Sequence, residues 1–272
     1  MTESSRSPES PLHRAIDLAQ VALRAEPSGL LTDFDGTLSG IVGDPTEARL
    51  VDGAADALAR LAERLASVAI ITGRAAGDAR QLIDVSGVLV VGNHGVEWLA
   101  PDASDPEPSP EAAVVAARLE ATLAAVPTDP GVVIERKGLS ATVHYRNAAH
   151  PTRAREGLLR SVEVAALHDI EVREGRMSVE LRPRGLGDKG RAARAIVERH
   201  ALRGVVVMGD DLTDLDMFEA VAELRAAGRI AAAIIGVGAS DGEVHPDVVA
   251  AADAMLADPD EAAAFLRALA LR

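Results

Sequence analysis

The chain has 272 residues, of which 48% are hydrophobic and 2% are aromatic, and it carries a formal net charge of −14. This acidity argues against nucleic acid or an anionic membrane as a partner, and the absence of cysteine excludes disulfides and thiolate metal sites. No apolar stretch is long enough to span a membrane and residues 1–6 are polar, so we expect a cytoplasmic protein. We also expect a monomer.

Short apolar runs alternate with helical patterns in the first hundred residues. Residues 1–11 are rich in Ser and Pro and are predicted to be disordered. Apolar residues at helical spacing predict helices over 12–25 and 53–66, while the runs 29–32 and 68–71 are typical of buried strands. Both runs end in polar turns, which contain Asp33, Asp35, Thr72 and Arg74.

The same pattern returns in the last third of the chain. Lys189 opens a helical segment, and the apolar run 205–208 is followed by Asp210, Asp211 and Asp214. Repeated strand–turn–helix units predict an α/β fold with a doubly wound, mostly parallel sheet, whose ligands bind at the carboxyl ends of the strands. The unusual polar residues fall at the edge where that rule places a site.

A different pattern lies between these two parts. Residues 101–110 contain four prolines, which excludes a helix or a central strand and predicts a domain boundary. The segment beyond it predicts a helix at 111–126, strands at 132–137 and 141–146, a helix at 151–167, and a hairpin of 170–173 with 177–181. We therefore predict an α+β domain at 101–184, inserted into a core formed by 12–100 and 185–272.

The first polar turn has a composition suited to phosphate chemistry. Asp33 and Asp35 are two residues apart at the end of a predicted strand, and Gly36 and Thr37 then turn the chain. Carboxylate and carbonyl oxygens are ligands that Mg²⁺ prefers, and a carboxylate beside the metal can attack phosphorus to form an aspartyl phosphate. An acidic cluster beside glycine is equally typical of an ordinary turn. The later motifs favour the chemical interpretation.

Four short motifs, in chain order, resemble those of the haloacid-dehalogenase-like phosphohydrolases. They lie at 33–37, at Thr72, at Lys189, and at 209–211 with Asp214. Within that superfamily the chain resembles the trehalose-6-phosphate phosphatase family over roughly residues 28–265. The segments that carry this likeness are 41–48, 71–74, 92–97, 135–137, 144–146, 178–183 and 187–190. One departure is visible, because Leu215 stands where the family usually has Glu.

The resemblance implies a role for each motif. Asp33 would be the nucleophile, and Asp35 would be the general acid and then the general base. Asp210, Asp33 and the Asp35 backbone carbonyl would hold Mg²⁺, while Lys189 and Thr72 would bind phosphoryl oxygens. The residues expected to support this set are Arg74, Asp211 and Asp214. Each of these residues also has an alternative without a catalytic role. Lys189 could be a solvated lysine at a helix start, and Thr72 could cap the following helix. Asp210, Asp211 and Asp214 could be acids that complement a helix dipole.

The predicted inserted domain offers polar groups on its strands. Glu135 and Lys137 share one strand face, His144 and Arg146 share a face of the next strand, and Glu180 lies on the last strand. The family resemblance makes four of these residues sugar contacts, joined by two residues of the core. The expected set is Glu135, Lys137, Arg146, Glu180, Asn93 and His94. The alternative is an ordinary solvated sheet face.

The function that the resemblance implies is Mg²⁺-dependent hydrolysis of trehalose 6-phosphate to trehalose and phosphate through an aspartyl-phosphate intermediate. The expected partner is therefore a small-molecule sugar phosphate. The alternatives are a phosphatase for sucrose 6-phosphate or mannosyl-3-phosphoglycerate, and a non-catalytic sugar-phosphate-binding subunit. The presence of both Asp33 and Asp35 argues against the non-catalytic alternative, which only Leu215 favours.

Overall fold

The computed structural model describes residues 10–42, 44–127, 129–137, 140–163, 170–175, 177–184, 187–239 and 244–271, with only the backbone at 137, 182 and 183. Of residues 1–11, which were predicted to be disordered, residues 1–9 lie outside this set, whereas Ser10 and Pro11 cap and begin a helix, contrary to the prediction. Helix α1 (Pro11–Leu23) begins one residue earlier than predicted, because the Ser10 side chain accepts a hydrogen bond from the His13 N–H and Pro11 occupies the first turn.

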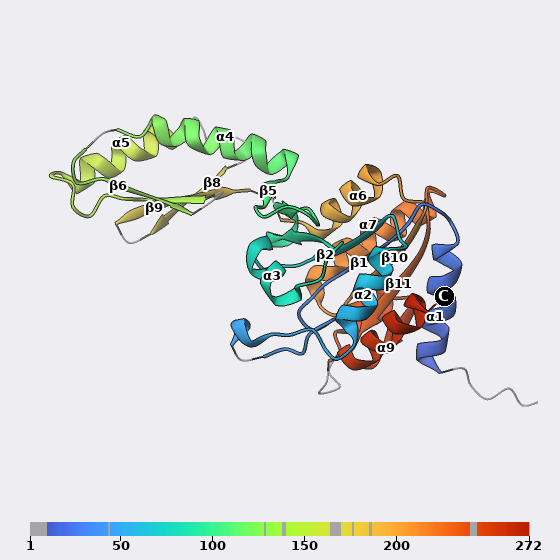
Figure 1. Ribbon diagram of the computed structural model, residues 1–272. Coiled ribbons are helices and arrows are strands. Elements are labelled where there is room, and N and C mark those ends of the chain that lie inside the picture. The colour runs from blue at the N-terminus through green and yellow to red at the C-terminus, as the bar shows by residue number, and fades with distance from the viewer. Residues whose placement is uncertain are drawn as a thin grey trace, which may run out of the picture. The chain divides into compact units, whose positions relative to one another are not determined.

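The chain divides into two compact units (Figure 1). The core unit comprises Met1–Glu107 and Gly187–Arg272, and the inserted unit comprises Pro108–Leu186. The insertion predicted at 101–184 starts too early relative to this division. The reason is that β4 (Glu97–Leu99) and β5 (Glu107–Pro108) continue the core sheet at its edge, so most of the proline-rich segment belongs to the core.

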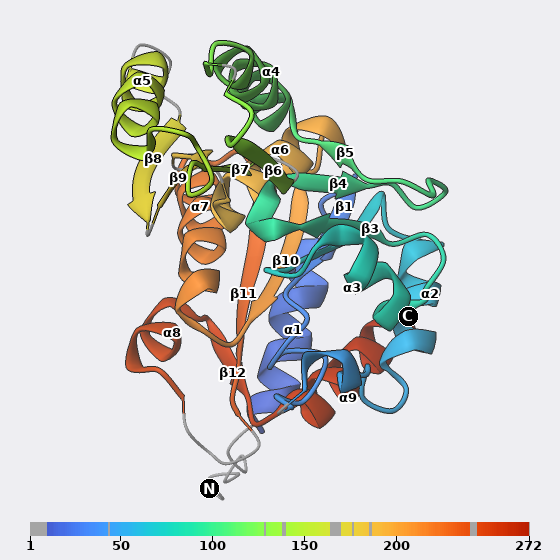
Figure 2. The ribbon, with the colours of Figure 1, turned by 90° about the vertical axis from the view of Figure 1, so that its left-hand side faces the viewer.

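The core sheet has eight strands in the order β12-β11-β10-β1-β2-β3-β4-β5 (Figure 2). The parallel strands are β1 (Ser28–Thr32), β2 (Ser67–Ile71), β3 (Leu89–Gly92), β10 (Gly204–Gly209), β11 (Ala231–Val237) and β12 (Ala254–Leu256). Strand β4 runs antiparallel to β3. This sheet, with helices on both faces, confirms the predicted α/β fold.

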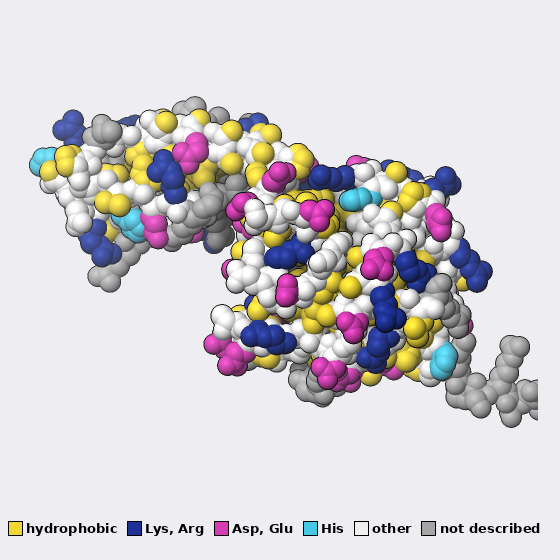
Figure 3. Space-filling view, in the orientation of Figure 1, with side chains coloured by type: hydrophobic (Ala, Val, Ile, Leu, Met, Phe, Trp, Pro, Cys, Tyr) yellow, Lys and Arg dark blue, Asp and Glu magenta, His cyan; other side chains and the backbone are white. Residues whose placement is uncertain are grey.

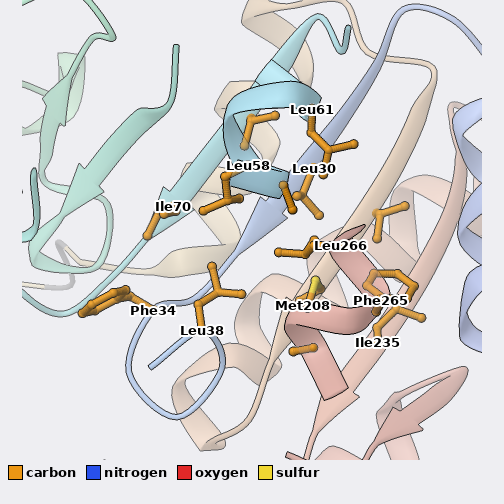
Figure 4. Packing of buried hydrophobic residues seen from close by; sticks show 14 of the residues in the cluster. Leu30, Phe34, Leu38, Leu58, Leu61, Ile70, Met208, Ile235, Phe265 and Leu266 are labelled. Carbon is orange, nitrogen blue, oxygen red and sulfur yellow. The ribbon is translucent and has the colours of Figure 1, made fainter. Parts of the chain in front are cut away.

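Alternate residues of the central strands enter two separate cores. On β1, Leu30 packs in one hydrophobic cluster and Leu31 in the other, as the two-residue period of a strand requires. Figure 4 shows Leu30 near Leu58 and Leu61, and Met208 near Phe265 and Leu266, all in the first cluster. A sheet buried on both faces explains why these strands are apolar without a break.

Helices of the core unit cover both faces of the sheet. The first cluster includes residues of α1, α2 (Ala54–Ala62), α3 (Ala76–Ile83) and α9 (Pro259–Ala270). The second includes residues of α6 (Lys189–Arg199), α7 (Leu215–Ala226) and α8 (Pro246–Ala251). Polar groups of the buried strands are thereby confined to the strand ends.

The inserted unit is an antiparallel sheet with two helices. The strand order is β6-β7-β9-β8, formed by β6 (Val133–Lys137), β7 (Ser140–His144), β8 (Ile170–Gly175) and β9 (Ser178–Pro183). Helices α4 (Pro110–Ala124) and α5 (Pro151–Glu163) share one hydrophobic cluster with the sheet. The elements predicted between 111 and 181 therefore form in the predicted order.

The surface carries both signs of charge. On the face of the core unit drawn in Figure 3, acidic and basic side chains are interspersed rather than gathered by sign. No helix in the described part of the chain is long and apolar enough to cross a membrane.

Candidate active site

The sequence motifs meet at the carboxyl edge of the core sheet. Asp33 follows β1, Thr72 follows β2 and Asp210 follows β10, and β10, β1 and β2 are neighbours in the sheet. Lys189 is the first residue of α6. Because parallel strands all end at the same edge, three segments far apart in sequence bring their polar side chains together here.

Lys189 lies buried between two carboxylates. Its ammonium donates hydrogen bonds to Asp33 Oδ1 at 2.8 Å and to Asp214 Oδ1 at 2.7 Å. The Lys189 side chain is 3% exposed and that of Asp214 is 0% exposed. The alternative of a solvated lysine at the helix start is therefore wrong for Lys189. Its ammonium is buried and held by hydrogen bonds to two carboxylates.

Burial and charge set the protonation of this group. Burial alone would lower the pKa of Lys189, but Asp33 and Asp214 outweigh it and raise that pKa. Burial raises the pKa of Asp33 well above its usual value, and Lys189 offsets only part of this effect. Two carboxylates thus accept hydrogen bonds from a single ammonium.

Asp214 also organises the loop after β10. Its Oδ2 accepts hydrogen bonds from the backbone N–H of Asp210 at 2.9 Å and of Asp211 at 3.2 Å. Asp211 in turn accepts a hydrogen bond from the Thr213 N–H, which completes a reciprocal cap of the short helix Leu212–Asp214. Asp211 and Asp214 therefore cap a helix, and the alternative of acids at a helix start applies to both. Asp214 also accepts a hydrogen bond from Lys189.

Asp210 is the third carboxylate of the edge. Its Oδ1 accepts a hydrogen bond from the Thr37 hydroxyl at 2.7 Å. Burial raises the pKa of Asp210 to about 7, although the hydrogen bond from Thr37 favours the carboxylate. Gly36 has a φ of 84°, and a Cβ at this position would lie 2.0 Å from Asp210 Oδ2. The turn after Asp35 therefore needs glycine for both its conformation and its close approach.

The three carboxylates fit a hard cation. Asp33, Asp210 and Asp214 each offer one oxygen, and these oxygens lie within 4.8 Å of one another. Burial raises the pKa values of Asp33 and Asp210, and the neighbouring carboxylates raise them further, an effect that a bound cation would oppose. Asp214 already accepts hydrogen bonds at both oxygens, which leaves Asp33 and Asp210 as the better donors to a metal.

Asp35 is held differently from Asp33. Arg74 Nε donates to Asp35 Oδ2 and Arg74 Nη2 donates to Asp35 Oδ1, each at 2.7 Å. The Asp35 side chain is 39% exposed, whereas the Asp33 side chain is 6% exposed. The sequence suggested that Arg74 supports the site, and the structure identifies Asp35 as its partner.

Thr72 lies at the end of β2 and is buried. Its Oγ1 accepts a hydrogen bond from the Arg74 N–H at 3.2 Å. Helix α3 has Ala75 at its N-cap and no side-chain cap, so Thr72 does not cap that helix. Its hydroxyl stands at the same edge as Asp33 and Asp210.

Asn93 and His94 support the Thr72–Arg74 segment through their backbone. The Asn93 N–H donates to the Arg74 carbonyl at 2.7 Å, and the His94 N–H donates to the Thr72 carbonyl at 2.9 Å. Both residues have positive φ, 48° and 57°, a conformation that Asn and His adopt more readily than most residues. The Asn-His-Gly sequence is a local signal that favours such a turn.

The predicted sugar contacts lie in the inserted unit, where Glu135, Thr142 and Glu180 occupy one row across β6, β7 and β9. Glu135 Oε2 lies 3.1 Å from His144 Nε2. Strand β7 ends at His144, so Arg146 lies in the following turn and does not share a strand face with His144. The Lys137 side chain lies outside the described residues.

Comparison with known proteins identifies the family. The trehalose-phosphatase family profile matches residues 31–245. The chain belongs to the trehalose-phosphatase family. Leu215, at the one departure from the expected motif, begins α7 and packs against the second hydrophobic cluster, while Asp214 keeps its bonds to Lys189 and to the loop.

Individual relatives agree with the family match. The chain is 43% identical over 202 residues to the trehalose-phosphate phosphatase of Mycolicibacterium paratuberculosis, covering 70% of this chain and 50% of the relative. It is 37% identical over 226 residues to that of Mycobacterium bovis, covering 76% and 54%. The chain thus spans about half the length of these curated relatives. The structure of trehalose-6-phosphate phosphatase from Aspergillus fumigatus matches with a TM-score of 0.59 and 26% identity, covering 98% of this chain and 99% of that one.

Removal of the Lys189 ammonium should destabilise the protein. Lys189→Met leaves Asp33 and Asp214 buried without their cation, and breaking a buried ion pair in this way costs about 3–5 kcal/mol. Urea unfolding followed by circular dichroism measures the change in the free energy of unfolding. Arg191→Met, at an exposed position of the same helix, is the control and should change it by less than about 1 kcal/mol. Equal effects of the two substitutions would contradict the proposed importance of the buried pair.

Proposed function

We propose that this chain is a Mg²⁺-dependent phosphomonoesterase that hydrolyses trehalose 6-phosphate to trehalose and phosphate. The observation that carries the proposal is a buried carboxylate, Asp33, at the carboxyl edge of the sheet, bonded to the Lys189 ammonium and next to Asp210. The relatives at 37–43% identity that are called trehalose-phosphate phosphatases support the choice of substrate. We further propose a monomer in the cytoplasm, where a chain without cysteine loses nothing in a reducing environment.

The first chemical step uses Asp33 and Asp35. A carboxylate oxygen of Asp33 attacks phosphorus, the bond from phosphorus to the sugar oxygen breaks, and its electron pair leaves with that oxygen. Asp35, in its protonated form, gives its proton to the leaving oxygen, so trehalose departs as an alcohol. Lys189 and the Thr72 hydroxyl bind phosphoryl oxygens and stabilise their charge.

The second step regenerates the enzyme. The Asp35 carboxylate takes a proton from water as the water oxygen attacks phosphorus, and the bond from phosphorus to Asp33 breaks. Asp33 departs as a carboxylate, and phosphate is released. One residue can serve both steps because the second proton transfer reverses the first.

We propose that Asp33, Asp210 and the Asp35 backbone carbonyl hold Mg²⁺. When bound there, the ion would supply positive charge, which would reduce the repulsion between the attacking carboxylate and the phosphate. Asp214, Asp211 and the backbone around them would fix the loop that carries Asp210.

We propose that the inserted unit recognises the sugar. Glu135 and Glu180 present carboxylates from two strands that flank β7, and charged acceptors suit the many hydroxyl donors of a disaccharide. Lys137 and Arg146 remain proposed contacts. For Asn93 and His94 we now favour support of the Thr72–Arg74 segment, since that is what their backbone bonds do.

A phosphate-release panel tests the proposed reaction. We expect release from trehalose 6-phosphate with Mg²⁺ and loss of release after chelation by EDTA, restored by added Mg²⁺. Sucrose 6-phosphate and mannosyl-3-phosphoglycerate are the competing substrates. Preference for either one would overturn the choice of sugar, and full activity after exhaustive chelation would overturn the metal assignment.

Asp33 and Asp35 should fail in different ways. Asp33→Asn removes the nucleophile and should abolish the phosphoenzyme, detected by mass spectrometry after acid quenching. Asp35→Asn keeps the nucleophile but loses proton transfer, so turnover of trehalose 6-phosphate should fall roughly 10²–10⁴-fold. Near-normal turnover of Asp33→Asn would show that water, not aspartate, attacks phosphorus.

The proposed sugar contacts predict a substrate-dependent loss. Glu180→Ala should lower kcat/KM for trehalose 6-phosphate by at least about 10-fold, because remote binding energy also positions the phosphoryl group. Activity on p-nitrophenyl phosphate, which has no sugar, should remain. Glu174→Ala is the matched control: it lies on the neighbouring strand β8 and pairs with Arg155 of α5. Equal losses on both substrates would assign Glu180 to the fold instead.

A further inference from the structure

Arg74 makes three side-chain hydrogen bonds that join two segments of the core unit. Its Nε and Nη2 bind the two oxygens of Asp35, and its Nη1 donates to the Pro45 carbonyl at 2.6 Å. The Arg74 guanidinium carbon lies 5.6 Å from the centroid of the Phe34 ring. The loop after the first motif and the loop after β2 are therefore linked through one guanidinium.

The backbone of Arg74 is fixed as well. Its carbonyl accepts the Asn93 N–H, and its own N–H donates to Thr72 Oγ1. The Ala76 N–H, two residues on, donates to Glu97 Oε2 at 3.0 Å. Arg74 thus projects from a segment that the end of β3 and strand β4 hold in place, which is what a group that orients another side chain requires.

Asp35 depends on this arginine for its orientation. Its carboxylate is more exposed than that of Asp33, and among the described residues Arg74 alone makes a hydrogen bond to it. A planar guanidinium that binds both oxygens fixes the plane of the carboxyl group as well as its position. Loss of the guanidinium would leave the χ angles of Asp35 free to vary.

We propose that Arg74 is a positioning residue for the proton transfer that Asp35 performs. Each oxygen of Asp35 accepts one hydrogen bond from the guanidinium and has a second lone pair. One oxygen carries a proton there and delivers it to the leaving oxygen as the phosphorus–oxygen bond breaks. The proposal rests on the acid–base role of Asp35 given above. It predicts that loss of Arg74 lowers kcat more for substrates whose leaving group needs a proton than for those whose leaving group does not.

The test compares two substrates that lack any sugar. Phenyl phosphate has a poor leaving group and p-nitrophenyl phosphate a good one, so only the first depends strongly on general acid catalysis. We expect Arg74→Gln to lower kcat on phenyl phosphate about 10-fold more than on p-nitrophenyl phosphate. Arg74→Lys should recover part of the loss, because an ammonium binds one oxygen but not both. Added guanidinium ion should partly rescue Arg74→Ala on phenyl phosphate.

A double-mutant cycle separates positioning from structure. In an Asp35→Asn background, Arg74→Gln should change kcat on phenyl phosphate by less than about 2-fold, since a residue that acts through Asp35 has nothing left to act on. Arg49→Gln is the control: Arg49 bonds to the Thr46 and Ala48 carbonyls in the same loop, and it should show no preference between the substrates.

The outcomes are distinct. Losses that are equal on both substrates, or that persist in the Asp35→Asn background, would overturn the proposal and assign Arg74 to the fold or to phosphoryl binding. Unchanged kcat of a folded Arg74→Gln, verified by circular dichroism, would overturn it too. Failure to hydrolyse trehalose 6-phosphate would refute the proposed substrate but not this inference. If Asp35→Asn alone had no effect, both the acid–base assignment and this inference would fall.

Discussion

The buried contact of the Lys189 ammonium with Asp33 and Asp214 is the interaction on which the site depends. It joins the end of β1, the start of α6 and the loop after β10 at a point that water barely reaches. Burial, together with the neighbouring carboxylates, raises the pKa values of Asp33 and Asp210, and the Lys189 ammonium offsets only part of this effect. The three carboxylates at this edge fit a hard cation, as the proposed reaction requires.

The two-sided burial of the core sheet decides where this chemistry lies. Residues of β1, β2 and β10 alternate between two hydrophobic clusters, so none of their side chains within the strands is available to a ligand. Polar groups can appear only where the strands end, and parallel strands end together. The sheet of the inserted unit packs its helices on one face, so its rows of polar residues, such as Glu135 and Glu180, are compatible with binding a hydroxyl-rich ligand.

Asp33 and Asp35 are separated by one residue yet occupy different environments. Asp33 is buried and fixed, which suits the nucleophile proposed for this site, since it must attack along a defined line. Asp35 is partly exposed and held by Arg74, which suits the proposed general acid and base. Gly36, with its positive φ, turns the chain directly after Asp35 and lies against Asp210.

The sequence by itself determined the parallel α/β core, the inserted α+β segment and the set of acids at the strand ends. These follow from local patterns: apolar runs, helical spacing and polar turns that recur in order. Only the tertiary structure decided which side chains pair. Arg74 reaches Asp35 across 39 residues and Lys189 reaches Asp33 across 156, and no local pattern specifies such partners. In the tertiary structure β7 ends at His144, so Arg146 does not lie on the strand face. Strands β4 and β5 belong to the core sheet. Strand ends and side-chain partners depend on packing between distant segments, and a periodic pattern along one segment does not contain that information.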